Sequence, residues 1–187
     1  EEGAVRVNGH LITTLPAWVN PKQDVITVHG RRVRTAAPAI CLMFFKPRGV
    51  VCTADDPEGR KTIFDLVRHP SGVRLFSIGR LDMDSSGLLL MTNDGELSNL
   101  LTHPSRHVPR TYDVLVSGEV DPSTIQKLMR GIRLKDERSG RTHQARFNSV
   151  RITRTQRDRT RLRIVLAEGR NRQIRRMMLQ VGHPVRK

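Results

Sequence analysis

Aromatic residues and cysteines are scarce in this chain of 187 residues, and each scarcity excludes a class of protein. Aromatic side chains make up 4% of the sequence, with one tryptophan and one tyrosine. Proteins that bind single-stranded nucleic acid by stacking its bases need more aromatic platforms than this. The two cysteines, Cys41 and Cys52, lack metal-site spacing, so we expect both to be core residues in a reducing compartment.

Long apolar runs and acidic residues are also in short supply. No run approaches the roughly 20 apolar residues of a membrane-spanning helix, and no signal-peptide pattern opens the chain, so we expect no membrane partner. Lysines and arginines number 33 against 18 acidic residues, a net charge of +15. This imbalance favours a polyanionic partner, without distinguishing RNA from DNA. Neither helix-turn-helix nor zinc-finger spacing is found, which disfavours a DNA-binding protein.

The most informative stretch is residues 77–92. Phe76 and Ile78 lead in with strand-like alternation, and Leu88–Met91 form the short apolar run of a fully buried strand. Between these strands lies a polar loop with an arginine, two aspartates and two glycines. Because both ends of the loop are fixed, its side chains can be aimed. From the residues alone, it is either a tight turn whose aspartates bond back to the backbone or a functional site.

Two motifs carry a family resemblance. Residues 79–88, Gly-Arg-Leu-Asp-Met-Asp-Ser-Ser-Gly-Leu, resemble the catalytic motif of the RNA pseudouridine synthases, in the branch that modifies ribosomal RNA and carries an S4-like N-terminal domain. The family's catalytic aspartate matches Asp82, not Asp84. Residues 168–177, Glu-Gly-Arg-Asn-Arg-Gln-Ile-Arg-Arg-Met, form the strongest match and align Arg175 with the arginine that pairs with that aspartate. The resemblance implies an ionised Asp82 compensated by Arg175 in a dry pocket.

Tyr112 is the third catalytic candidate. It lies on an expected strand at 110–116, whose period of two puts it on one face with two valines, so core packing is the ordinary interpretation. The tyrosine also matches the one that stacks on the target base in the family. A stretch at 141–146, Arg-Thr-His-Gln-Ala-Arg, resembles a signature of a sister branch. We interpret it as a coincidental match in a strand region.

The RNA-binding candidates are all basic. Arg80 is expected either to occupy the gap left by the extruded base or to hold a flanking phosphate. Lys46 belongs to a Lys-Pro-Arg-Gly segment that we interpret as mainly architectural, with RNA contact as the alternative. A helix with Asn171 as its N-cap candidate is expected to carry further arginines at an anion-binding end. The remaining candidates are Arg110, Arg170, Arg172 and Arg176.

The resemblance implies an α+β fold with a mixed, mainly antiparallel sheet and flanking helices. Residues 1–35 are expected to be the C-terminal part of an S4-like RNA-binding domain, and residues 36–187 a catalytic domain trimmed at its C-terminus. Residue patterns add a buried strand at Ile40–Phe45. They also predict helices capped by Thr62, by Asn93 or Asp94, and by Asp121.

The implied activity is isomerisation of specific uridines in ribosomal RNA to pseudouridine, with no cofactor and no metal. The expected partner is ribosomal RNA or a pre-ribosomal particle, and a monomer is the working expectation. The expected compartment is the cytoplasm of a bacterium, with a mitochondrion or plastid as the alternative. The competing hypothesis is a catalytically silent RNA-binding ribosome-assembly factor on the same fold, whose charge would look the same.

Overall fold

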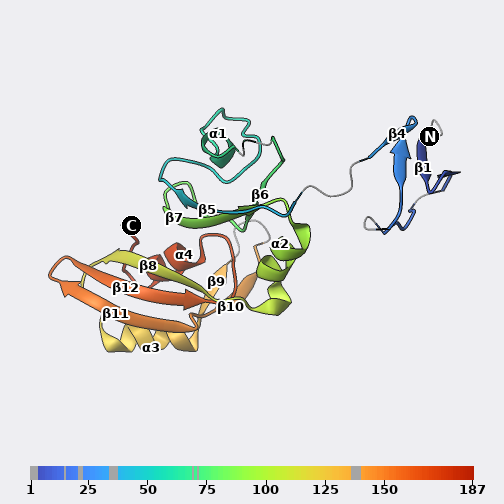
Figure 1. Cartoon of the computed structure of the whole chain (residues 1–187). Coiled ribbons are helices and arrows are strands. Elements are labelled where there is room, and N and C mark those ends of the chain that lie inside the picture. The colour runs from blue at the N-terminus through green and yellow to red at the C-terminus, as the bar shows by residue number, and fades with distance from the viewer. Residues whose placement is uncertain are drawn as a thin grey trace.

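The chain folds into small antiparallel sheets flanked by short helices, as the computed structural model in Figure 1 shows. The structure describes residues 4–14, 16–20, 23–33, 38–68, 70, 72–135 and 140–187. Within these ranges every strand ladder is antiparallel, and the parallel contact is an isolated bridge between Val51 and Thr62. The predicted α+β class is confirmed. None of the helices in the described ranges is both long and apolar enough to cross a membrane.

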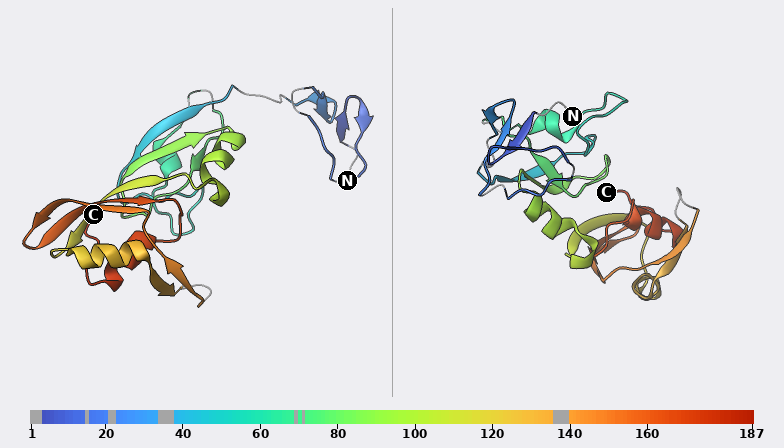
Figure 2. Two further views of the ribbon diagram at one scale, coloured as in Figure 1. Left: turned by 90° about the horizontal axis from the view of Figure 1, so that it is seen from below. Right: turned by 90° about the vertical axis from the view of Figure 1, so that its right-hand side faces the viewer.

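The N-terminal sheet has the strand order β2-β1-β3-β4. Its strands are β1 (Val5–Val7), β2 (His10–Leu11), β3 (Ile26–Val28) and β4 (Arg31–Arg32). The Asn8-Gly9 turn has positive φ at both residues, 50° and 83°, as a two-residue hairpin turn requires. Figure 1 and the left view of Figure 2 draw this sheet apart from the remainder of the chain. The expected domain boundary at residue 35 falls within 34–37, outside the described residues.

The first half of the remaining chain, residues 40–106, is built on a three-stranded sheet of order β5-β7-β6. Its core contains Val50, Ile63, Leu75, Leu89 and Met91. Thr62 begins the first helix with a reciprocal capping box, and Asp94 caps the second, as predicted. The elements are β5 (Cys41–Lys46), α1 (Ile63–Leu66), β6 (Phe76–Ile78), β7 (Gly87–Thr92), α2 (Gly95–Thr102) and the 3-10 turn η1 (Pro104–Arg106).

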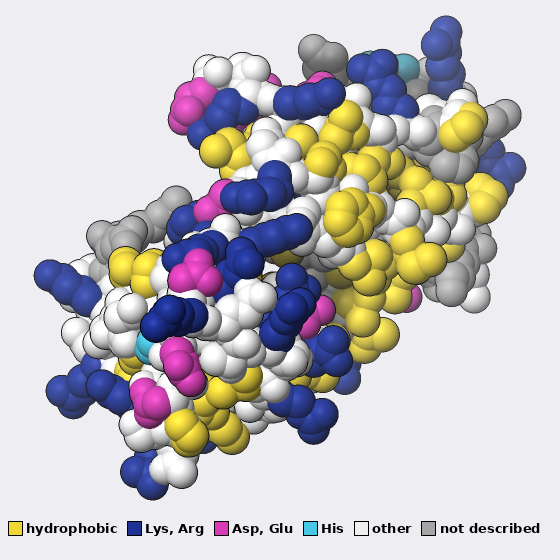
Figure 3. Space-filling model, turned by 90° about the vertical axis from the view of Figure 1, so that its left-hand side faces the viewer, with side chains coloured by type: hydrophobic (Ala, Val, Ile, Leu, Met, Phe, Trp, Pro, Cys, Tyr) yellow, Lys and Arg dark blue, Asp and Glu magenta, His cyan; other side chains and the backbone are white. Residues whose placement is uncertain are grey.

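One face of this sheet is open to solvent, which corrects the expectation of fully buried strands. Met43, Phe45 and Leu88 are 81%, 72% and 64% exposed, although they belong to the apolar runs of β5 and β7. Cys41 is exposed too, so it is not a core residue. Strands with continuous apolar runs need cover on both faces, and in the described chain this face is covered only in part. Figure 3 shows the result as a band of hydrophobic side chains on the surface.

The second half, residues 110–187, has a three-stranded sheet of order β11-β12-β8 and a β9–β10 hairpin. Its larger core packs α3 and α4 against the sheet through Leu128, Met177 and Met178. The 141–146 stretch lies largely in strand β10, as interpreted. The elements are β8 (Arg110–Ser117), α3 (Pro122–Arg130, capped by Asp121), β9 (Ile132–Lys135), β10 (Thr142–Ala145), β11 (Ser149–Gln156), β12 (Arg159–Leu166) and α4 (Gln173–Gln180).

Candidate active site

A buried lysine supports the β6–β7 loop from the interior of the protein. The side chain of Lys46 is fully buried at the end of β5, and its ammonium donates to the backbone carbonyls of Pro47, Asp82 and Ser85 at 2.9–3.0 Å. Burial lowers the pKa of Lys46, and the negative charges nearby, including Asp82, act in the opposite direction. These three bonds agree with the architectural interpretation of Lys46, and RNA contact by this lysine stays a prediction.

Two backbone contacts complete this support. The N–H of Gly49, at a φ of 81° that favours glycine, donates to the carbonyl of Met83 at 2.7 Å. The N–H of Leu81 lies 3.5 Å from the sulfur of Cys52. Within the loop, the N–H of Ser85 donates to the carbonyl of Asp82 at 3.0 Å, which closes a tight turn. The loop is therefore a tight turn closed by a backbone hydrogen bond, and its role as a functional site stays a prediction.

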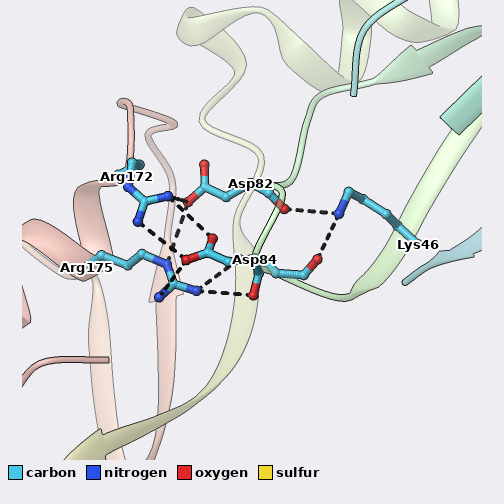
Figure 4. Close-up of polar contacts among 6 residues, drawn as sticks. Lys46, Asp82, Asp84, Arg172 and Arg175 are labelled. Atoms are coloured by element: carbon cyan, nitrogen blue, oxygen red, sulfur yellow. Dashed lines mark hydrogen bonds and ion pairs between the residues drawn. The ribbon is translucent and has the colours of Figure 1, made fainter. Parts of the chain in front are cut away.

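Helix α4 supplies the opposing charges. It begins after Arg172, whose left-handed backbone (φ 46°) replaces the predicted Asn171 cap, and no side chain caps the helix. The amide of Gln173 is buried and donates to Glu168 at 2.6 Å, while Met177 and Met178 anchor the helix in the core. This packing presents Arg172 and Arg175 on the side that faces the β6–β7 loop (Figure 4).

Two carboxylates and two guanidiniums form a cluster between the halves of the chain (Figure 4). Arg172 contacts both Asp82 and Asp84 at 3.4 Å. Arg175 lies 3.8 Å from Asp82 but 3.1 Å from Asp84, so the predicted Asp82–Arg175 pair exists while the closer pairing is with Asp84. The side chains of Asp82 and Asp84 are 32% and 34% exposed, so the cluster is open to solvent rather than dry.

The two aspartates differ in how fully they are engaged. Both carboxylate oxygens of Asp84 are contacted by the guanidiniums at 3.1–3.4 Å, whereas Asp82 is contacted through Oδ2 only. Among the described residues, Oδ1 of Asp82 accepts no hydrogen bond, and both measured ion-pair contacts run to Oδ2. Arg175 also approaches the carbonyl of Asp84 and the hydroxyl of Ser85, at 3.4 and 3.5 Å. Asp84 therefore fixes the guanidiniums, and Asp82 keeps an oxygen for a ligand.

The pKa shifts agree with this difference between the two aspartates. Partial burial raises the pKa of Asp84, but Arg172 and Arg175 outweigh burial, so its pKa lies below the usual range. Burial raises the pKa of Tyr112; the charge of Arg110 lowers it and that of Asp82 raises it further. Tyr112 lies on β8, packed against the larger core, and Asp82 is near enough to affect its titration. Asp82 and Arg175 thus lie together, and the shared site with Tyr112 stays a prediction.

The other basic candidates divide into two groups. Arg80 is exposed next to the loop, and its guanidinium has no polar partner in the described part of the chain. Arg170 is exposed and pairs with Glu168 at 3.0 Å. Arg110 donates to the carbonyl of Leu101 at 3.0 Å, and Arg176 donates to the carbonyl of Lys135, so these two fasten neighbouring elements. RNA contact by Arg80, Arg110, Arg170, Arg172 and Arg176 stays a prediction.

Sequence reasoning missed the part played by Asp84, because the family motif directs attention to a single aspartate. The signal was present: Asp82 and Asp84 are two residues apart in a loop with fixed ends, and Arg172 and Arg175 are one helical turn apart. It also missed the buried link between Glu168 and Gln173, which positions the start of α4.

Comparison with known proteins places this geometry in context. Residues 40–180 match the family model described as RNA pseudouridylate synthase. Similar curated proteins are ribosomal large subunit pseudouridine synthase B from Bacillus subtilis (40% identity over 185 residues, 99% of this chain and 73% of that protein) and from Vibrio vulnificus (41% over 181 residues, 95% and 54%). The Salmonella typhi protein of the same name is 40% identical over 186 residues, and the chain spans 62% of its length.

Solved structures support the same fold. A structure titled as that of a pseudouridylate synthase superposes with a TM-score of 0.68 at 26% identity, covering 99% of this chain and 75% of that one. The human RNA pseudouridylate synthase domain containing 4 superposes with a TM-score of 0.53 at 13% identity over 78% of this chain and 63% of that one. At that identity, the second likeness concerns the fold alone.

Proposed function

Because this chain belongs to the RNA pseudouridylate synthase family, we propose that it isomerises uridine to pseudouridine in RNA of the large ribosomal subunit. The substrate class comes from the names of its bacterial relatives. The proposed compartment is the bacterial cytoplasm, where ribosomal RNA is made. The N-terminal sheet of residues 4–33 is proposed as part of an S4-like RNA-binding domain.

The observation that carries the proposal is the free oxygen of Asp82. The reaction breaks the N1–C1′ bond of uridine, turns the base and joins C5 to C1′, so it needs a carboxylate beside the sugar and a site that retains the freed base. Asp82 is one-third exposed, has Oδ1 unengaged, and lies near Tyr112, whose ring can form a wall for the base. Asp82 serves as nucleophile or as base at the sugar.

The remaining residues prepare this carboxylate. Arg172 and Arg175 place positive charge beside Oδ2 of Asp82, and Asp84 holds both guanidiniums so that they do not close over Oδ1. The target uridine must leave its stack, at a cost of a few kcal/mol, and contacts of the basic surface with phosphates offset that cost. Arg80, exposed beside the loop, is the residue proposed to occupy the gap or hold a flanking phosphate.

The test compares Asp82→Asn with Asp84→Asn on a ribosomal RNA fragment. Asp82→Asn should lower the single-turnover rate by about 10³-fold or more, the scale for a group that acts on the reacting atoms, while RNA binding stays within twofold. Asp84→Asn should retain measurable turnover, because it removes only a positioning contact. Mass-shift labelling of pseudouridine and filter binding are the two measurements. Equal turnover by wild type and Asp82→Asn would reject the assignment, and binding without turnover by wild type would favour the silent assembly factor.

A further inference from the structure

The outer face of the β8–β12–β11 sheet is separated from the candidate active site by the sheet itself. Along β8, Tyr112, Val114 and Val116 point toward the core and the helices, so the alternate residues Asp113 and Leu115 point to the other side. Their partners on β12 are Arg163 opposite Asp113 and Arg161 opposite Leu115. In Figure 1 these three strands lie side by side, and they share one outward surface.

This outward surface gathers arginines in opposing pairs. Arg151 on β11 lies directly opposite Arg163, and Arg154 lies opposite Arg161. A register shift between Ile152 and Arg154 allows Arg154 to share the face with Arg151, although the two are three residues apart. Like charges directly opposite each other in a sheet are destabilising. The opposed arginines therefore lower the stability of the sheet instead of supporting its folding.

Few acidic groups balance this face. Arg163 pairs with Asp113 at 3.3 Å, and Arg159 lies 3.7 Å from Asp158. The guanidiniums of Arg151, Arg154 and Arg161 are exposed and make no polar contact within the described ranges. A depression of about 220 Å³ on this side of the molecule is lined by Leu115, Arg154, Gln156, Arg159 and Arg161. Two of the three unpaired guanidiniums, those of Arg154 and Arg161, therefore line one hollow, and such a pair is suited to bind phosphate groups.

We propose that this outer face binds the phosphate backbone of a double-helical RNA segment. This proposal depends on the proposed function in one respect: the RNA that the face binds is the substrate RNA of the enzyme. None of the outward side chains on these strands is aromatic, so the face has no platform for unpaired bases and recognises backbone alone. Because Tyr112 points to the other side of β8, a structured RNA would place one strand or loop at the active site and a neighbouring helical arm on the arginines.

The test neutralises the unpaired arginines together, as Arg151→Gln, Arg154→Gln and Arg161→Gln. With the full chain and a stem-loop RNA, affinity at about 0.1 M salt should fall roughly 10- to 100-fold, and the slope of log K against log salt should decrease by about two to three. Affinity for an unstructured RNA of equal length should change less than twofold. Thermal melting should stay the same or rise, because like-charge repulsion is removed.

The matched control is the exposed set Lys127→Gln, Arg130→Gln and Arg133→Gln, which removes the same charge from α3 and β9. An equal loss with the control set would overturn the proposal, since it would mean that net charge alone matters. Equal losses for both RNAs would overturn the preference for helical RNA, and a lowered melting temperature would assign the arginines to the fold. Binding is measured without turnover, so the result stands whether or not pseudouridine is formed.

Discussion

The two halves of the chain after the N-terminal sheet, residues 40–106 and 110–187, hold their parts of the candidate site in different ways. In the described chain, the first half buries five hydrophobic residues in its core and the second half thirteen. The carboxylates of Asp82 and Asp84 come from the half with the small core, and the guanidiniums of Arg172 and Arg175 from the half with the large one. The difference in core size means that the first half needs another device to fix its loop.

Lys46 is that device. Hydrophobic contacts are non-directional, whereas the three bonds of its buried ammonium fix three particular carbonyls on both sides of the β6–β7 turn. Helix α4 is instead positioned by the packing of Met177 and Met178 and by the Gln173–Glu168 bond. We call the hydrogen bonds of Lys46 the polar clamp and the packing of Met177 and Met178 the apolar anchor. Substitutions in the two should affect stability differently.

The largest effect on stability is expected from Lys46→Met. It leaves three inward-facing carbonyls without their donor, and with roughly 1–3 kcal/mol for each unsatisfied buried group, partly relieved by relaxation, the free energy of unfolding should fall by about 2–5 kcal/mol. Turnover should fall as well, because Asp82 loses its support. Denaturant unfolding and single-turnover rates are the measurements.

The control for this substitution is Lys127→Met, at an exposed position of α3, which should change stability by less than about 0.5 kcal/mol. If Lys46→Met unfolds at the same denaturant concentration as wild type and keeps its rate, the loop is held by something other than this lysine. The contrast between a polar clamp and an apolar anchor would then be lost.

Features that depend on neighbouring residues could be predicted from the sequence. The caps at Thr62, Asp94 and Asp121 follow from side chains that accept hydrogen bonds from N–H groups two or three residues away. The loop at residues 79–87 follows from turn residues between apolar runs, and the family resemblance predicted the Asp82–Arg175 contact. These predictions depend on neighbouring residues or on a family motif, so they can be made without the tertiary structure.

Features set by distant parts of the chain could not be predicted. The exposure of Met43, Phe45 and Leu88 depends on what covers a sheet face, and a continuous apolar run gives no information about that cover. The closer Arg175–Asp84 contact depends on how α4 approaches a loop some 90 residues earlier. Arg172 adopts a left-handed conformation that is uncommon for arginine, so local propensity favoured Asn171 as the cap.

The next effect in size is expected from Arg175→Ala, compared with Arg172→Ala. Arg175 is 18% exposed and contacts both carboxylates, whereas Arg172 is 45% exposed. Loss of a partly buried pair should lower the free energy of unfolding by about 1–2 kcal/mol for Arg175→Ala and by less than about 1 kcal/mol for Arg172→Ala. Thermal melting at low and high salt gives the comparison, and Arg175→Ala should also be the slower enzyme.

A double variant of both arginines distinguishes a joint clamp from two separate pairs. Because both guanidiniums share Asp84, their effects on stability should not add. Additive losses would show that each arginine acts alone, and a larger loss for Arg172→Ala would reverse the assigned order.

The smallest effect is expected from the ionisation of Asp84. Its pKa is lower in the folded chain than the usual value near 3.9, so the folded state favours the ionised carboxylate. The stabilisation is complete above the unfolded pKa and is lost as pH falls through the lower folded value.

The measurement is the difference in unfolding free energy between wild type and Asp84→Asn. It should be constant from about pH 5 to 7 and should shrink below about pH 4. Its size should stay below about 1 kcal/mol, because the group is one-third exposed. Glu119→Gln, which also removes one carboxylate at an exposed position, is the control. A difference that grows on acidification would mean that the two arginines do not favour the charged form of Asp84, and the polar link between the halves would then have to depend on Asp82 alone.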